Sequence, residues 1–80
     1  MENKLAVLAV IVDEYEAVER VNALLHDFRD YIVGRMGLPY RQKHVNIISV
    51  VLDAPATVIN SLSGKLGMTE GVSSKVLTAK

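Results

Sequence analysis

Two stretches of the chain, Leu5–Val12 and Val45–Leu52, are apolar at nearly every position. Both are rich in β-branched residues, and a strand that is apolar on both faces is typically buried in the middle of a sheet. Tyr31–Met36 and the more polar Val72–Thr78 predict two further strands. The Gly37–Pro39 segment is expected to end the second of the four strands, because glycine and proline interrupt regular pairing.

Two segments between these strands show the spacing of helices. In each, the apolar residues recur at intervals of three or four, which places them on one face of a helix. The first stripe consists of Ala17, Val18, Val21, Leu24, Leu25 and Phe28. The second consists of Val58, Ile59, Leu62 and Leu66.

The ends of both helices carry recognisable residue types. We expect Asp13 to cap the first helix, with Glu16 three residues later completing a capping box. Asp53 is the corresponding cap candidate for the second helix, with Pro55 in its first turn. Gly67 is expected to end that helix.

The resulting order is β-α-β-β-α-β, and the two halves resemble each other: Val10–Asp13 lies forty residues before Val50–Asp53. This order predicts one α+β domain over residues 1–80, a ferredoxin-like sandwich with a four-stranded antiparallel sheet and two helices on one face. In that topology the first and third strands are central. These are the two strands that are apolar on both faces.

Two helices cover only one face of such a sheet, so the other face exposes one alternating set from each central strand. Either set is mainly aliphatic, and an apolar patch of that size is unusual on a monomer. We therefore expect a homo-oligomer, a dimer or a tetramer, that pairs through this face; the alternative is that loops or chain ends cover it. The interface candidates are Leu5, Val7, Ile11, Val45, Ile47 and Val51.

Composition narrows the function classes. The 80 residues include nine basic and nine acidic side chains and no cysteine, so disulfides and thiolate chemistry are excluded. A neutral domain has no general attraction to nucleic acid or to an anionic membrane. The apolar run Leu5–Val12 is too short to span a bilayer, Glu2 precedes it and the acidic Asp13–Glu16 follows it, so we expect a cytoplasmic protein without a membrane or direct nucleic-acid partner.

No residue pattern predicts catalysis, a metal site or a cofactor. The only histidines are His26 and His44, and their spacing from acidic residues matches no ligand motif. The serines lack a nucleophile elbow. Ser63–Gly67 contains a Gly-Lys pair, but it falls at the end of a helix, where the dipole disfavours an anion. We therefore expect a protein that is not an enzyme.

One group of polar residues surrounds the central hairpin. It combines basic and aromatic side chains beside a Gly-Leu-Pro turn, where an irregular backbone can present donors to an anion. These candidates for binding a small ligand or a protein partner are Arg35, Tyr40, Arg41, Lys43 and His44, with Tyr31 as a further aromatic neighbour. The alternative is a hairpin tip that its charges keep hydrated.

Two motifs, Arg35–Arg41 and Leu62–Gly67 followed by Gly71, Val72 and Lys75, resemble a known family. With the β-α-β-β-α-β order, the chain is similar over nearly its whole length to the small regulators assigned to the iron-only hydrogenase system. The resemblance implies an ACT-like fold related to the ligand-binding domain of nickel-responsive regulators, a bacterial regulatory role that includes transcription regulation, and no catalytic residues. The chain lacks the histidines and cysteine of the nickel site, and its turn at Val12–Glu14 lacks the glycine of the amino-acid site of ACT domains.

The sequence thus predicts a non-catalytic regulatory module, a homo-oligomer that senses a small ligand or a partner protein. The chain has no DNA-binding motif, so any effect on transcription requires another protein. The alternative is a metal- or metabolite-binding module with its site at a subunit interface. RNA binding on the sheet is the least favoured function, because the central strands present aliphatic instead of aromatic side chains.

Overall fold

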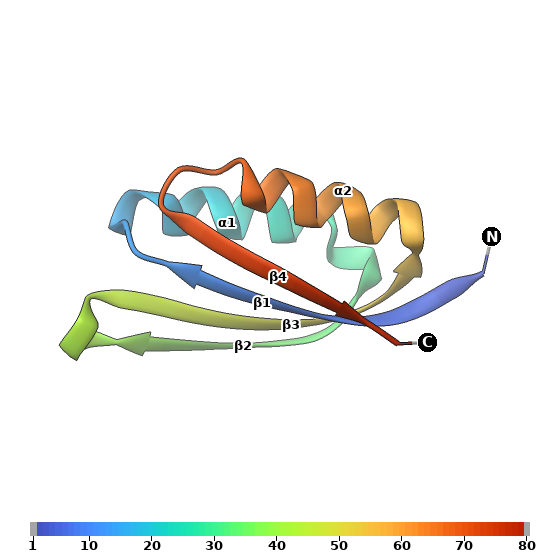
Figure 1. Ribbon diagram of the computed structural model, residues 1–80, viewed down its shortest axis with the longest axis horizontal. Coiled ribbons are helices and arrows are strands. Elements are labelled where there is room, and N and C mark those ends of the chain that lie inside the picture. Colours follow the sequence, from blue (N-terminus) through green and yellow to red (C-terminus); the bar gives the residue numbers. More distant parts are fainter. Residues whose placement is uncertain (1, 80) are drawn as a thin grey trace.

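The computed structural model describes residues 2–79 as two layers, a four-stranded sheet and a pair of helices (Figure 1). The elements follow the order β-α-β-β-α-β, with two short 3-10 turns beside β2. Their bounds are β1 Asn3–Val12, α1 Tyr15–Asp27, η1 Arg29–Tyr31, β2 Ile32–Tyr40, η2 Arg41–Lys43, β3 Val45–Pro55, α2 Ala56–Gly67 and β4 Val72–Thr78. The fold is α+β and ferredoxin-like, as the sequence predicts.

The sheet is antiparallel, with the strand order β2-β3-β1-β4. The two strands that are apolar on both faces, β1 and β3, are the central pair. Their register places Val7 opposite Val51 and Val12 opposite Asn46. From Leu5 onward the burial pattern of β1 alternates, and its even-numbered positions from Ala6 to Val12 are buried against the helices.

The second strand is longer than the sequence predicts. The expectation that Gly37–Pro39 ends it is wrong, because β2 pairs with β3 as far as Tyr40, opposite Val45. Pro39 is tolerated because β2 lies at the edge of the sheet, where a missing backbone donor can face solvent. A shift of register between Ile32 and Gly34 marks a β-bulge at the start of this strand.

Both predicted helix caps are wrong. The residue at the N-cap of α1 is Glu14 and not Asp13, and no side chain caps the helix. The backbone N–H of Asp13 donates to the carbonyl of Gly71, 2.9 Å away, and the helix begins at Tyr15. At α2 the N-cap is Pro55, since β3 continues through Asp53, which pairs with Leu5.

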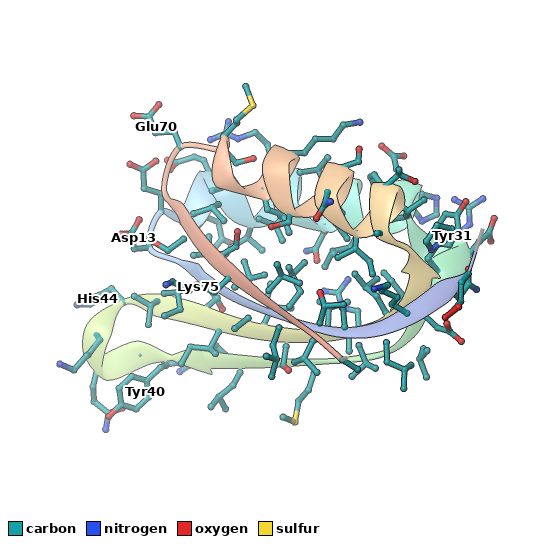
Figure 2. All side chains as sticks on the ribbon, turned by 45° about the vertical axis from the view of Figure 1, so that its right-hand side comes forward. Asp13, Tyr31, Tyr40, His44, Glu70 and Lys75 are labelled. Carbon is teal, nitrogen blue, oxygen red and sulfur yellow. The ribbon has the colours of Figure 1, made fainter. Side chains whose placement is uncertain are left out.

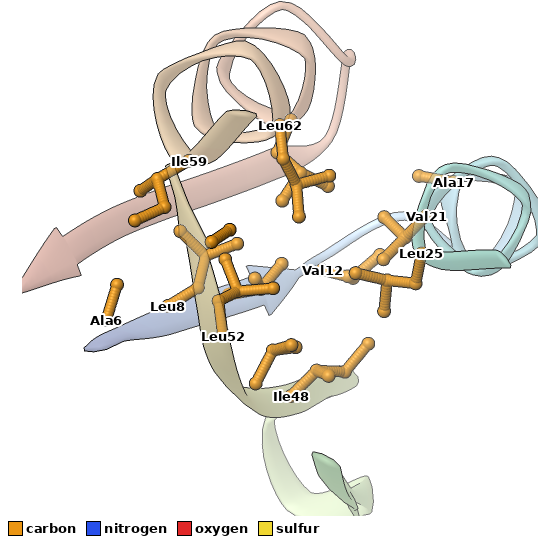
Figure 3. Close-up of a cluster of buried hydrophobic side chains, with 14 residues drawn as sticks. Ala6, Leu8, Val12, Ala17, Val21, Leu25, Ile48, Leu52, Ile59 and Leu62 are labelled. Atoms are coloured by element: carbon orange, nitrogen blue, oxygen red, sulfur yellow. The ribbon is translucent and has the colours of Figure 1, made fainter. Parts of the chain in front are cut away.

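One apolar core lies between the sheet and the helices (Figure 3). Helix α1 contributes Ala17, Val21 and Leu25, and α2 contributes Ile59, Leu62 and Leu66. The strands supply alternate residues such as Leu8 and Leu52, which are fully buried. Full burial of an aliphatic side chain stabilises the fold by about 1.5–3 kcal/mol, so this layer supplies most of the driving force for folding.

The opposite face of the sheet is open (Figure 1). Residues that pair directly across strands point to the same side of a sheet, so the register identifies the side chains of this face. Its exposed large apolar members are Leu5, Val7, Ile11, Met36, Leu38, Tyr40, Ile47 and Leu77. We call this surface the open face.

Candidate functional site

A groove lies between the β1–α1 turn and the β2–β3 hairpin. Its volume is about 580 Å³, within the range of small-molecule sites. The β1–α1 segment lines it with Val12, Asp13 and Tyr15. The hairpin lines it with Pro39, Tyr40, Arg41, His44, Val45 and Asn46. We call this site the hairpin groove.

The two walls of the hairpin groove meet because β1 and β3 are neighbours. Val12, the last residue of β1, pairs with Asn46 near the start of β3, so the chain leaving β1 passes beside the hairpin. Figure 2 shows Asp13, His44 and Tyr40 at this same end of the molecule, with Tyr31 at the other. Tyr31 lies in η1, before β2, so the sequence grouping of Tyr31 with the hairpin is wrong.

The backbone of the hairpin tip is held in an unusual conformation. His44 has φ 55° and ψ 39°, the left-handed region that a residue with a Cβ rarely adopts. Its N–H donates to the carbonyl of Arg41 over 3.2 Å, which closes the η2 turn. Residues in such strained conformations cluster at binding sites, where the surrounding structure stabilises them despite the strain.

The hairpin groove offers groups of several kinds. Arg41 and His44 supply donors for an anion, and Asp13 supplies a carboxylate on the facing wall. The two tyrosines, Tyr15 and Tyr40, supply flat apolar surfaces with a polar tip. A small polar molecule with an anionic group and a flat or apolar part matches this lining.

The structure divides the five residues predicted for this site. Tyr40, Arg41 and His44 line the hairpin groove, and Lys43 lies in η2 at the exposed tip without lining it. Arg35 lies elsewhere: its Nη2 donates to Oδ1 of Asn22 on α1 over 2.8 Å, and it lines grooves between α1 and β2. Arg35 pairs with the buried Val50, so it points to the helix side of the sheet.

Sequence reasoning missed Asp13 and Tyr15, which come from the β1–α1 wall, and Asn46 on the hairpin wall. The turn at Val12–Glu14 was a signal, because it corresponds to the ligand turn of ACT domains. The lack of glycine there argued against it. Asp13 was assigned to the helix cap, and the capping geometry of α1 leaves its side chain free of that role.

The six interface candidates lie on the open face. Leu5, Val7 and Ile11 are 55%, 42% and 47% exposed, and Ile47 is 38% exposed. Val45 and Val51 are half-buried among them. The two small residues Ala9 and Ser49 pair at the middle of the sheet, which leaves a shallow centre between aliphatic side chains.

Two features are absent from residues 2–79. No group of three or more histidine, cysteine, aspartate or glutamate side chains in this part of the chain could hold a metal ion. None of the described helices is both long and apolar enough to cross a membrane.

The βαββαβ sandwich with an open sheet face places the chain in the ferredoxin-like class of small α+β domains. Residues 4–76 match the model of the TM1266-like family, described as "Iron-only hydrogenase system regulator, putative", and the chain belongs to this family. The resemblance seen in the sequence is thereby confirmed.

Solved structures agree with this assignment. The uncharacterized protein TM1266 from Thermotoga maritima is 39% identical, with a TM-score of 0.95 over 99% of this chain and 100% of that one. None of the curated proteins matches the chain.

More distant structures show the fold alone. The C-terminal domain of the MgtC protein from Mycobacterium tuberculosis is 14% identical, with a TM-score of 0.71 over 96% of this chain and 88% of that one. A formyltetrahydrofolate deformylase from Pseudomonas putida KT2440 is 16% identical, with a TM-score of 0.65 over 91% of this chain and 28% of that one. The same sandwich thus occurs in proteins with different functions, so function has to be argued from the sites of this chain.

Proposed function

We propose that this protein is a non-catalytic regulatory module of the iron-only hydrogenase system that acts as a homo-oligomer. The observation that carries the proposal is the open face, where eight large apolar side chains from all four strands are exposed together. Contiguous apolar surfaces of this kind are rare on monomers and mark interaction sites. The family description supports the regulatory role.

A second copy of the chain is the partner that fits this face best. The surface is flat, aliphatic and rimmed by few charges, with Lys75 opposite Ala9 and Asp53 opposite Leu5. Two such sheets pack face to face at about 10 Å with interdigitating side chains. A symmetric pair would bury the same patch twice, as the commonest homodimers do.

The hairpin groove gives the oligomer a place for a signal. It lies at one end of the sheet, and Tyr40 and Val45 belong both to its lining and to the strand positions of the open face. A ligand or partner loop bound there would contact residues at the edge of the subunit interface. Binding in the hairpin groove would therefore change the assembly. A regulator that acts through another protein requires such a coupling between ligand binding and its interaction surface.

The first experiment measures assembly. Light scattering coupled to gel filtration at micromolar concentration should give at least twice the chain mass for the wild-type protein. Val7→Glu places a charge in the middle of the open face and should give the monomer mass with an unchanged circular dichroism spectrum. Ala23→Glu, on the exposed side of α1, is the control and should keep the oligomer. A wild-type monomer, or an oligomer that survives Val7→Glu, contradicts the proposal.

The second experiment looks for the ligand. Native mass spectrometry of protein purified from its own host reports the assembly and any retained molecule together. A retained small molecule should be lost in Arg41→Gln, while the mass of the assembly and the melting temperature stay the same. Retention in that variant would show that the molecule binds outside the hairpin groove.

A further inference from the structure

A second groove lies between α1 and β2, and it shares no lining residue with the hairpin groove. Its volume is about 340 Å³, and six residues line it: Asn22, Leu25, His26, Arg29, Ile32 and Arg35. Three of these come from α1, one from η1 and two from β2. The groove is therefore built where the helix layer meets the edge strand of the sheet.

The charge of this groove differs from that of the whole chain. The chain has nine basic and nine acidic residues, with four arginines and two histidines. Two of the four arginines and one of the two histidines line this one groove, and none of its lining residues is acidic. The hairpin groove, by contrast, pairs Arg41 with Asp13. The lining of this groove is thus basic on a neutral protein, although Asp27 and Asp30 lie next to His26 and Arg29 in the sequence.

Both guanidinium groups are held by neutral acceptors. Nη2 of Arg35 donates to Oδ1 of Asn22 over 2.8 Å, and Nη1 of Arg29 donates to the carbonyl of His26 over 2.9 Å. Neither acceptor is a carboxylate, so neither guanidinium is neutralised by a full opposite charge. The carbonyl of His26 lies in the last turn of α1, where the helix dipole places partial negative charge, so Arg29 offsets that charge and Arg35 carries more of the attraction for an anion. Each guanidinium has five N–H donors, so most of them remain for a ligand.

The floor and the rim of the groove differ in polarity. Leu25 is buried and Ile32 is half-buried beneath the groove, whereas Asn22, His26, Arg29 and Arg35 are exposed at its rim. The charges of the two arginines are therefore screened by solvent, and direct hydrogen bonds from their guanidinium groups are the main interaction that the groove offers an anion.

We infer that this groove binds the phosphoryl group of a small phosphorylated molecule. A phosphate monoester carries up to two negative charges and three acceptor oxygens, which match two guanidinium forks and an imidazole. A carboxylate carries one negative charge and can be bound by a single guanidinium. It would therefore contact only one of the two arginines of the groove. This inference is independent of the proposed oligomer and of the hairpin groove.

The test is a titration followed by ¹H–¹⁵N nuclear magnetic resonance, with inorganic phosphate, phenyl phosphate and benzoate at matched ionic strength. Amide signals of residues 22–35 should shift with both phosphates and much less with benzoate. Binding of both phosphates with equal affinity identifies the free ion as sufficient, whereas tighter binding of phenyl phosphate identifies an ester as the preferred form. No shift in this segment with either phosphate overturns the inference.

Variants then locate the site. Arg29→Gln and Arg35→Gln should each weaken phosphate binding roughly tenfold or more, since each removes charged hydrogen bonds. Arg20→Gln, an exposed arginine of α1 outside the groove, should leave the affinity unchanged. Arg35→Lys keeps the charge but loses the fork, and should bind more weakly than wild type. Losses in Arg29→Gln and Arg35→Gln no greater than the loss in Arg20→Gln overturn the inference.

Discussion

The α-carbon of Gly71 lies against the side chain of Glu14, so that a Cβ on Gly71 would come within 2.7 Å of the Cβ of Glu14. Gly71 has φ +80°, and its carbonyl accepts the N–H of Asp13. This contact joins the loop before β4 to the turn before α1, and so fixes one wall of the hairpin groove.

Gly71→Ala should therefore lower the free energy of unfolding by about 2–4 kcal/mol. A residue with a Cβ in the left-handed region costs about 1–2 kcal/mol, and the overlap with Glu14 adds to this. Gly64→Ala is the matched control, because an added Cβ meets nothing within 4 Å inside α2. That variant should gain about 0.5–1 kcal/mol. Urea unfolding of both variants measures the difference, and equal effects would contradict this reading of the turn.

Truncation to alanine on the two opposite faces of β1 should have different effects, one on the stability of the monomer and the other on assembly. Leu8 is fully buried under the helices, so Leu8→Ala should cost about 2–5 kcal/mol at every protein concentration. Leu5 is 55% exposed, so Leu5→Ala should change the stability of the monomer little. Its effect should appear as weaker assembly, measured by sedimentation over a dilution series. A large concentration-independent loss in Leu5→Ala would mean that the open face does not pair between copies.

The conformation of His44 predicts that replacing it with glycine raises the stability of the fold and weakens ligand binding. His44→Gly removes the strain of the left-handed residue, about 1–2 kcal/mol, but adds chain entropy to the unfolded state. The free energy of unfolding should therefore rise by about 0.5–1 kcal/mol, as measured by thermal unfolding. If the hairpin groove binds a ligand through the imidazole, the same variant should lose that ligand. A more stable variant with unchanged binding would remove His44 from the site.

A cation–π contact should tie the end of α2 to the end of α1. The Nζ of Lys65 lies 5.5 Å from the centre of the Phe28 ring. Lys65→Met should cost about 0.5–1 kcal/mol, the usual value at exposed sites, and Lys65→Arg should restore most of it. The double variant Lys65→Met with Phe28→Leu completes the cycle, and a coupling energy of zero would show that the contact contributes nothing.

Metal content is the last prediction. With two histidines and no cysteine, the chain has too few strong ligands for a tight transition-metal site of its own. Elemental analysis after purification without chelators should give no stoichiometric zinc, nickel or iron. One metal per chain or per dimer, lost in His44→Ala, would favour the interfacial metal site instead.

The sequence by itself determined the order of the elements and the central place of β1 and β3. This was possible because strands that are apolar on both faces are typically central in a sheet, and the β-α-β-β-α-β order places the first and third strands there. It also determined that an apolar face would be left open, since either alternating set of Leu5–Val12 is aliphatic. It failed at the helix caps, where the N–H of Asp13 is used by Gly71, a residue far along the chain.

Only the tertiary structure decided which residues share a site. Arg35 and Tyr40 are five positions apart on one strand, so the pleat directs them to opposite faces of the sheet, and the cluster predicted from their proximity in sequence divides into two grooves. Asp13 and Tyr15 reach the hairpin because antiparallel pairing places Val12 opposite Asn46. Composition and periodicity contain no information about that register, since it depends on how the sheet packs against the helices as a whole.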